Sequence, residues 1–197
     1  MTSSFGALRR AAVAVVAVAV VAALGAAMAA PAGALSDPEE WGDTFCTGTV
    51  GWLGGAQAGA EQLATQSNDP SLTPAAGRAL IVEYLTTGVD ATKEFGQSLK
   101  QAGAPKIANG AKIQASILAG ITGSGLELAA LLKLAKALPT GSQKVFDKAA
   151  SRLGDKLSSF SDPFSKSLAK ADKLDEGNQL GGILESLPSC AALSTVG

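Results

Sequence analysis

Three times in this chain an Asp or Thr is followed by proline and then by apolar residues at helical spacing. The pairs are Asp37-Pro38, Thr73-Pro74 and Asp162-Pro163. An oxygen-bearing side chain caps the free N–H groups of a helix start, and proline fits the first helical position because no N–H is needed there. Glu39 and Glu40 add favourable negative charge at the first start. We therefore expect helices to begin at the first two pairs and a helix to restart at the third.

The rest of the chain continues this helical pattern. Apolar residues recur every three to four positions, and no segment shows the alternation of β-branched and aromatic residues typical of strands. Thr140 and Gln143 have the spacing of a capping box, and the glycines at 120–125 predict a kink or weak point near Gly123. The expected helical segments are 37–66, 73–101, 109–138, 140–160, 162–174 and a short turn at 183–187. The predicted fold class is all-α, a single-domain antiparallel bundle of four to five helices.

One face of the first segment is formed by glycines. Gly51, Gly55 and Gly59 are four residues apart and so line up along the helix. Glycine weakens a helix interior, so three in register indicate that another backbone approaches closely. Such a face packs helices in lipid. We favour the other interpretation, in which it lets a neighbouring helix of a water-exposed bundle pack tightly.

The N-terminus has the pattern of a secretory signal peptide. Arg9 and Arg10 precede an uncharged apolar run at 11–30, and Ala32-Gly33-Ala34 fits a signal peptidase site. We expect a signal peptide at 1–34, cleaved after Ala34, and a secreted helical domain at 35–197. The alternative is an uncleaved anchor at 11–30, because twenty residues of helix span about 30 Å, the thickness of a bilayer core.

Export determines how the two cysteines are interpreted. Outside the cytosol an even pair is expected to form a disulfide, whereas in the cytosol free thiols would be expected. Cys46 and Cys190 lie near the two ends of the mature chain. We predict that they are bonded to each other and clamp the bundle, with two unpaired thiols as the alternative.

The composition excludes several classes of function. There is no histidine, so a His-dependent catalytic triad or metal site is ruled out, and two cysteines cannot complete a zinc or iron–sulfur site. The formal net charge of −1 argues against nucleic-acid binding. A Ser167-x-x-Lys170 string lacks the companion motifs of acyl-transfer enzymes, and Glu83 and Asp90 fall on an expected water-exposed face. We predict a non-catalytic protein with no metal and no cofactor.

Positive charge is concentrated late in the chain. Between 128 and 173 bases outnumber acids, and before and after this block acids outnumber bases. The bases at helical spacing are Lys144, Lys148, Arg152 and Lys156, followed by Lys166, Lys170 and Lys173. They could form a patch for anionic polymers or phospholipid head groups. The alternative, which we favour, is a solvated face that Asp147 and Asp155 partly neutralise.

Several turns and caps resemble those of one protein group. The relevant residues are Gly103-Ala104-Pro105, Asn109 to Ile113, Ala137 to Thr140, Phe146, Leu153 and Pro188-Ser189-Cys190. With them the chain resembles small secreted helical proteins of high-GC Gram-positive bacteria, the actinobacteria. The resemblance implies export, an all-helical fold and paired cysteines, and implies no activity.

Together these observations predict an extracellular or cell-envelope binding or interaction module. One alternative is a carrier that holds a hydrophobic small molecule or lipid between its helices, since Ala- and Gly-rich helices with few aromatics could leave a cavity. Another is an anchored envelope protein that contacts anionic polymers through the basic residues. The expected partners are an envelope polymer, a lipid or another protein.

Overall fold

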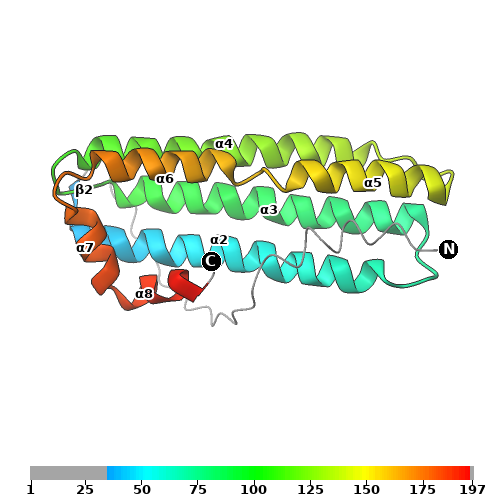
Figure 1. The fold of residues 1–197 in the computed structure, drawn as a ribbon, viewed down its shortest axis with the longest axis horizontal. Helices are drawn as coiled ribbons and strands as arrows, with labels where there is room; N and C mark the ends of the chain where they lie inside the picture. Colours follow the sequence, from blue (N-terminus) through cyan, green and yellow to red (C-terminus); the bar gives the residue numbers. More distant parts are fainter. Residues whose placement is uncertain (1–34, 196–197) are drawn as a thin grey trace.

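The computed structural model describes residues 35–195, and the predicted signal peptide at 1–34 lies outside the described residues. The chain forms α2 (Pro38–Ser67), α3 (Pro74–Ala102), α4 (Gly110–Lys136), α5 (Gln143–Leu157), α6 (Asp162–Leu174), α7 (Gln179–Ser186), α8 (Pro188–Ala191) and a 3-10 turn (Ala192–Thr195). Figure 1 shows α2, α3 and α4 as three long rods, with α5 and α6 end to end as a fourth. The all-α bundle is thus confirmed.

Most helix ends follow the local sequence. The Asp37 side chain accepts a hydrogen bond from the Glu39 backbone N–H at 2.9 Å, and Thr73 Oγ1 accepts one from Ala76 N–H at 3.3 Å, as the capping pairs predict. The predicted Thr140 capping box is wrong. The N-cap of α5 is Ser142, without a side-chain cap bond, and Gln143 donates instead to Asp147 Oδ1 at 2.8 Å.

The glycines of α4 do not interrupt the helix, which runs unbroken from Gly110 to Lys136. They mark where α6 approaches α4. A Cβ added at Gly120 would lie 2.5 Å from Ser167 Cβ, and one added at Gly123 would lie 2.8 Å from Pro163 Cβ. The prediction of a weak point near Gly123 is therefore replaced by close contact between α4 and α6.

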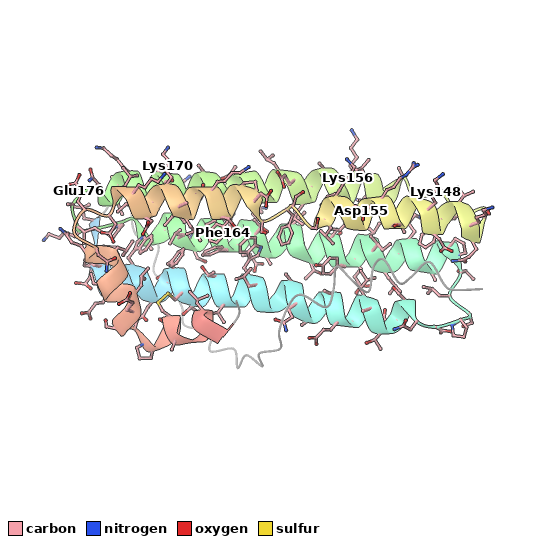
Figure 2. The ribbon with its side chains drawn as sticks, viewed as in Figure 1. Lys148, Asp155, Lys156, Phe164, Lys170 and Glu176 are labelled. Carbon is pink, nitrogen blue, oxygen red and sulfur yellow. A yellow bond between two sulfur atoms is a disulfide. The ribbon has the colours of Figure 1, made fainter. Side chains whose placement is uncertain are left out.

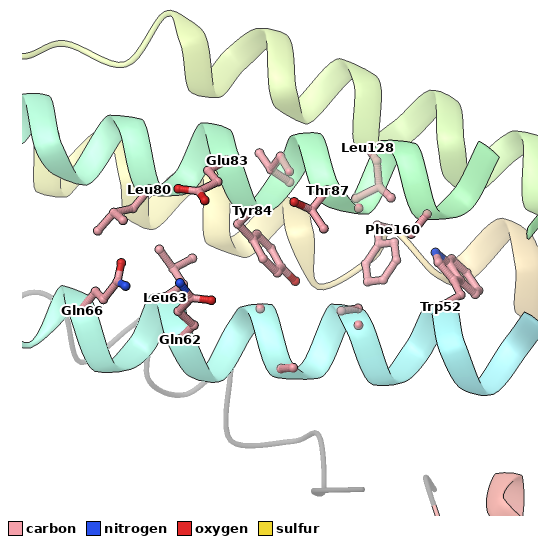
Figure 3. Close-up of a pocket in the computed structure, with 17 residues that line it drawn as sticks. Trp52, Gln62, Leu63, Gln66, Leu80, Glu83, Tyr84, Thr87, Leu128 and Phe160 are labelled. Atoms are coloured by element: carbon pink, nitrogen blue, oxygen red, sulfur yellow. The ribbon is translucent and has the colours of Figure 1, made fainter. Parts of the chain in front are cut away.

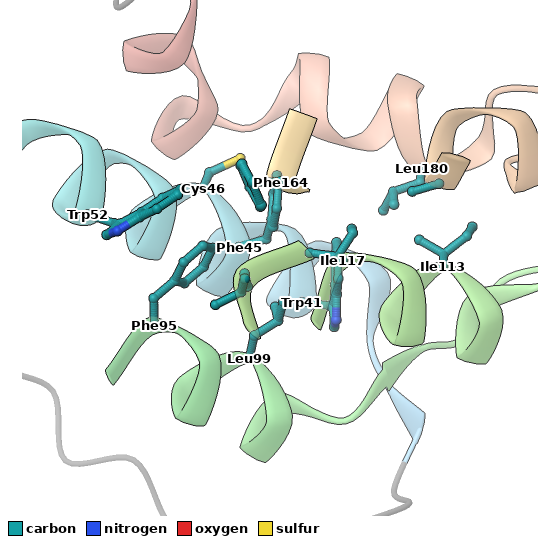
Figure 4. Close-up of a cluster of buried hydrophobic side chains, with 12 residues drawn as sticks. Trp41, Phe45, Cys46, Trp52, Phe95, Leu99, Ile113, Ile117, Phe164 and Leu180 are labelled. Atoms are coloured by element: carbon teal, nitrogen blue, oxygen red, sulfur yellow. The ribbon is translucent and has the colours of Figure 1, made fainter. Parts of the chain in front are cut away.

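Two buried clusters fill the bundle. The cluster at the disulfide end joins α2, α3, α4, α6 and α7 (Figure 4), and comprises Trp41, Phe45, Cys46, Trp52, Phe95, Leu99, Ile113, Ile117, Ile121, Phe164, Ala171 and Leu180. The buried members of the distal cluster come from α3, α4, α5 and the connection after α4, and they are Ile81, Leu85, Leu128, Leu131, Ala135, Leu138, Phe146, Ala150 and Leu153. No residue of α2 is among the buried members of the distal cluster. The second half of α2 is thus less completely packed than the first.

The C-terminal segment is tied to α2. Cys46 of α2 and Cys190 of α8 form a disulfide with a Cα–Cα distance of 4.9 Å, which confirms the predicted pairing. Figure 1 shows α7 and α8 beside the first half of α2. Ser189 Oγ also donates to Asp43 Oδ1 at 2.6 Å. Both links join α8 to this half of α2.

A very short sheet also appears, which the sequence did not predict. Leu35–Ser36 (β1) pairs in parallel with Ala104–Pro105 (β2), and Lys106 N–H donates to the Ser36 carbonyl at 2.9 Å. Two residues are too few to show the alternating pattern by which strands are recognised. The pairing holds the start of the described chain against the connection between α3 and α4.

Among the helices of residues 35–195, one is long and apolar enough to cross a membrane, and it is α4. This helix packs against α3, α5 and α6. Its residues Ile113, Ile117 and Ile121 are at most 2% exposed. Packing within the bundle therefore accounts for part of the apolar character of α4.

Candidate functional site

The three glycines of the face predicted on α2 have different surroundings in the structure. A Cβ added at Gly51 or Gly55 would meet no heavy atom of the described residues within 4 Å. At Gly59 the nearest atom is Tyr84 Cδ2, at 2.8 Å, a side chain and not a backbone. Among the described residues, close packing against a neighbouring helix is therefore found at Gly59 and not at Gly51 or Gly55. Another α2 glycine that a neighbouring ring crowds is Gly48, where an added Cβ would lie 2.6 Å from Phe95 Cε2.

Small residues in the second half of α2 leave space against α3. A cavity of about 270 Å³ lies between these helices (Figure 3). Its lining comprises Trp52, Gly55, Ala56, Ala58, Gly59, Gln62, Leu63 and Gln66 of α2, Leu80, Glu83, Tyr84, Leu85, Thr87, Gly88 and Ala91 of α3, Leu128 of α4, and Phe160. Gly55 and Gly59 thus line the wall of a candidate binding site.

The lining separates an apolar interior from a polar rim. Leu85 and Leu128 are nearly fully buried, whereas Gln62, Glu83 and Thr87 are exposed. Tyr84 lies between the two helices with its hydroxyl directed toward α2 (Figure 3), and burial raises the pKa of this phenol. An apolar interior with a few polar groups at its edge is the usual character of a small-molecule site.

The aromatic end of the cavity is held in place by specific contacts. Trp52 Nε1 donates to Thr92 Oγ1 at 2.8 Å, and Thr92 Oγ1 in turn donates to the Gly88 carbonyl at 2.7 Å. The Trp52 ring also meets Phe160 edge to face, with ring centroids 6.1 Å apart. These contacts fix Trp52, so this end of the cavity is preformed.

The predicted basic residues lie on a different surface. All seven, from Lys144 to Lys173, are exposed. Lys148, Lys156 and Lys170 lie along the side of α5 and α6 away from α2 (Figure 2). Asp155 is also exposed and lies within this stretch. The structure therefore places these bases along α5 and α6, which lie end to end, and away from the α2–α3 cavity.

The sequence motifs considered for catalysis are not drawn together into a site. Ser167 packs its Cβ and Oγ toward Gly120 of α4, and Lys170 is exposed. Glu83 and Asp90 are exposed too, and Glu83 lines the cavity. Within residues 35–195 no group of three His, Cys, Asp or Glu side chains is placed to hold a metal ion.

Sequence reasoning raised a cavity between helices as a possibility but did not identify its residues. Tyr84 was missed because it also fits the apolar stripe of its helix, and Gln62 and Gln66 were missed because they fit an ordinary helix surface. The available signal was the low side-chain volume of α2 after Trp52, where Leu53 and Leu63 are the remaining large apolar residues. Comparison with protein-family models, curated proteins and solved structures finds no match to this chain.

Proposed function

We propose that this chain is an exported, non-catalytic binding protein that holds a hydrophobic small molecule or lipid chain in the α2–α3 cavity. The observation that carries this proposal is the cavity itself, of about 270 Å³. Ligand sites in proteins are typically about 300–1,000 Å³ and largely apolar. The volume is close to the lower end of that range, and the lining has the expected mixture of apolar and polar groups.

The proposal that the protein is exported rests on two features of the chain. The N-terminal residues have the pattern of a signal peptide. Cys46 and Cys190 are bonded, and structural disulfides persist mainly in oxidising compartments. N-terminal sequencing of the exported protein distinguishes cleavage after Ala34 from retention of 11–30 as an anchor.

Native mass spectrometry of the purified protein tests the binding function. We expect a retained small molecule, and we expect the variant Gly88→Leu to lose it. Gly88 and Leu128 both line the cavity, and a Cβ at Gly88 would lie 3.7 Å from Leu128 Cδ1, an ordinary van der Waals distance. The Cβ of a leucine at position 88 therefore fits, and the rest of its side chain should occupy part of the cavity. The matched control is Gly51→Leu, which adds the same side chain at a position outside the lining.

The comparison of the two variants decides the outcome. Circular dichroism first establishes that both keep their helices. Loss of the ligand in Gly88→Leu and retention in Gly51→Leu supports the proposal. Equal retention in both folded variants, or no ligand in the parent protein and no binding of any hydrophobic probe, contradicts it.

A second candidate function is adhesion to anionic polymers of the cell envelope through the α5–α6 bases. The observation that favours it is the exposure of all seven side chains along one rod. Reversing Lys148 and Arg152 to Glu should abolish salt-sensitive association with envelope material, because both charges become repulsive. The control reverses Lys93 and Lys100, two exposed bases of α3. Unchanged retention of the α5 variant dismisses this function.

A further inference from the structure

We infer that the α2–α3 cavity takes an amphiphile with one linear apolar chain and a cationic head group. This inference rests on the proposed function and specifies the ligand class for the same site. Its two components, chain shape and head-group charge, come from separate observations.

The shape follows from the positions of the lining residues along the helices. On α2 the lining extends from Trp52 to Gln66, and on α3 from Leu80 to Ala91. At 1.5 Å per residue these stretches are about 21 and 16 Å long. The cavity volume, about 270 Å³, is small for a space that is lined over such a length. A space so long and so small in volume suits a single extended apolar chain better than a compact ring system.

The charge follows from which ionisable groups line the cavity. Among residues 35–195, Glu83 is the one charged residue that lines the cavity, and no lysine or arginine of this part of the chain lines it. The whole of α2, from Pro38 to Ser67, contains four acidic residues and no base. The bases of α5 and α6 do not line the cavity either. A carboxylate on the ligand would find no cationic partner among these lining residues and would be repelled by Glu83, whereas an ammonium group would be attracted.

The neutral groups of the rim complete the recognition of an ammonium head. Gln62, Gln66 and Thr87 supply side-chain oxygens that accept hydrogen bonds, and the Tyr84 hydroxyl does the same from between the helices (Figure 3). An ammonium group has only donors, so any of these oxygens that lies beside it can accept a hydrogen bond from it. The apolar chain would then lie along Leu63, Leu85 and Leu128.

Isothermal titration calorimetry of the full chain with four probes tests both components. Decylammonium, decanol and decanoate share one chain and differ in charge, and adamantylammonium has the same number of carbons and the same charge as decylammonium in a compact shape. We expect decylammonium to bind most tightly, about tenfold better than decanoate. We also expect decanol to fall between them and adamantylammonium to bind about tenfold more weakly than decylammonium.

A charge variant separates the two components. Glu83→Gln should remove the preference of decylammonium over decanoate without abolishing decanol binding. The matched control is Glu94→Gln, an exposed acid of α3 outside the lining, which should keep the preference. Decanoate binding as tightly as decylammonium to the parent chain overturns the assigned charge, and equally tight adamantylammonium overturns the linear shape, while both results leave the proposed function standing. Failure of all four probes refutes the inference and the proposed function together.

Discussion

Two glycines of α2 separated by less than one helical turn should respond in opposite ways to the same substitution. At Gly51 an added Cβ meets no described heavy atom within 4 Å, so Gly51→Ala changes only the backbone. Alanine is favoured over glycine in a helix interior by about 1 kcal/mol. For a domain of 150–250 residues that free energy raises the melting temperature by about 2–4 °C.

At Gly48 the added methyl group would overlap the Phe95 ring. The added Cβ would lie 2.6 Å from Phe95 Cε2, and Phe95 is only 4% exposed. Its ring is surrounded by Phe45, Trp52 and Phe164, at centroid distances of 6.3, 6.0 and 6.2 Å. Overpacking a filled core costs about 1–3 kcal/mol, which equals or exceeds the helical gain of about 1 kcal/mol. Gly48→Ala should therefore lose up to about 2 kcal/mol of stability.

Thermal and urea unfolding, followed by circular dichroism on oxidised protein, measures both changes. The prediction is a higher melting temperature for Gly51→Ala and a lower one for Gly48→Ala, with unchanged urea m-values. A loss of stability at Gly51 as large as that at Gly48 would mean that another part of the molecule does contact Gly51. That result would refute the assignment of this α2 face as unpacked.

Three further predictions concern buried groups. Ser124 Oγ is buried without a hydrogen-bond partner among the described residues, so Ser124→Ala should raise stability to urea by about 1 kcal/mol. The control Ser116→Ala, which removes a 3.2 Å bond to the Ser167 carbonyl, should lower it; a loss at both sites contradicts the argument. Reduction of Cys46–Cys190, which are 144 residues apart, should cost up to about 5 kcal/mol by chain entropy. The Cys46→Ala/Cys190→Ala variant should not respond to reductant, and an unchanged urea midpoint of the parent on reduction refutes the estimate. Because burial raises the pKa of Tyr84, the folded chain keeps this proton to higher pH than the unfolded chain, so stability should fall as pH rises above about 10. Tyr84→Phe should remove that decline, and tyrosinate absorbance reports Tyr84 alone because it is the sole tyrosine.

The helices were predictable because their signals are local. Asp37 and Thr73 cap the residues that follow them within three positions, and the structure starts α2 and α3 beside them. The disulfide was predictable for a different reason, since the chain offers only two cysteines and hence only one pairing. Local signals failed at the start of α5, where Thr140 and Ser142 are both possible N-caps. Which of the two caps the helix depends on the path of the connection after α4, and the local sequence does not specify that path.

The candidate site could not be predicted in the same way. A row of glycines on α2 is compatible with a close neighbour, with a cavity wall and with open solvent, and the helical spacing is identical in all three cases. Gly48 meets a phenyl ring, Gly51 meets nothing described, and Gly59 meets Tyr84. These differences come from side chains on α3, 47 residues away for Gly48 and Phe95 and 25 for Gly59 and Tyr84. Which positions face each other depends on how the helices pack.

For this protein, then, the amino-acid order alone determined the helical class, most helix starts and the covalent link between α2 and α8. Each of these depends on neighbouring residues or on a count. Only the tertiary structure decided which glycines are crowded, which bases share a surface and where space remains between α2 and α3. Packing decides these features because a void forms where no side chain of another helix fills the space. The sequence of one helix does not show which side chains of the other helices face it.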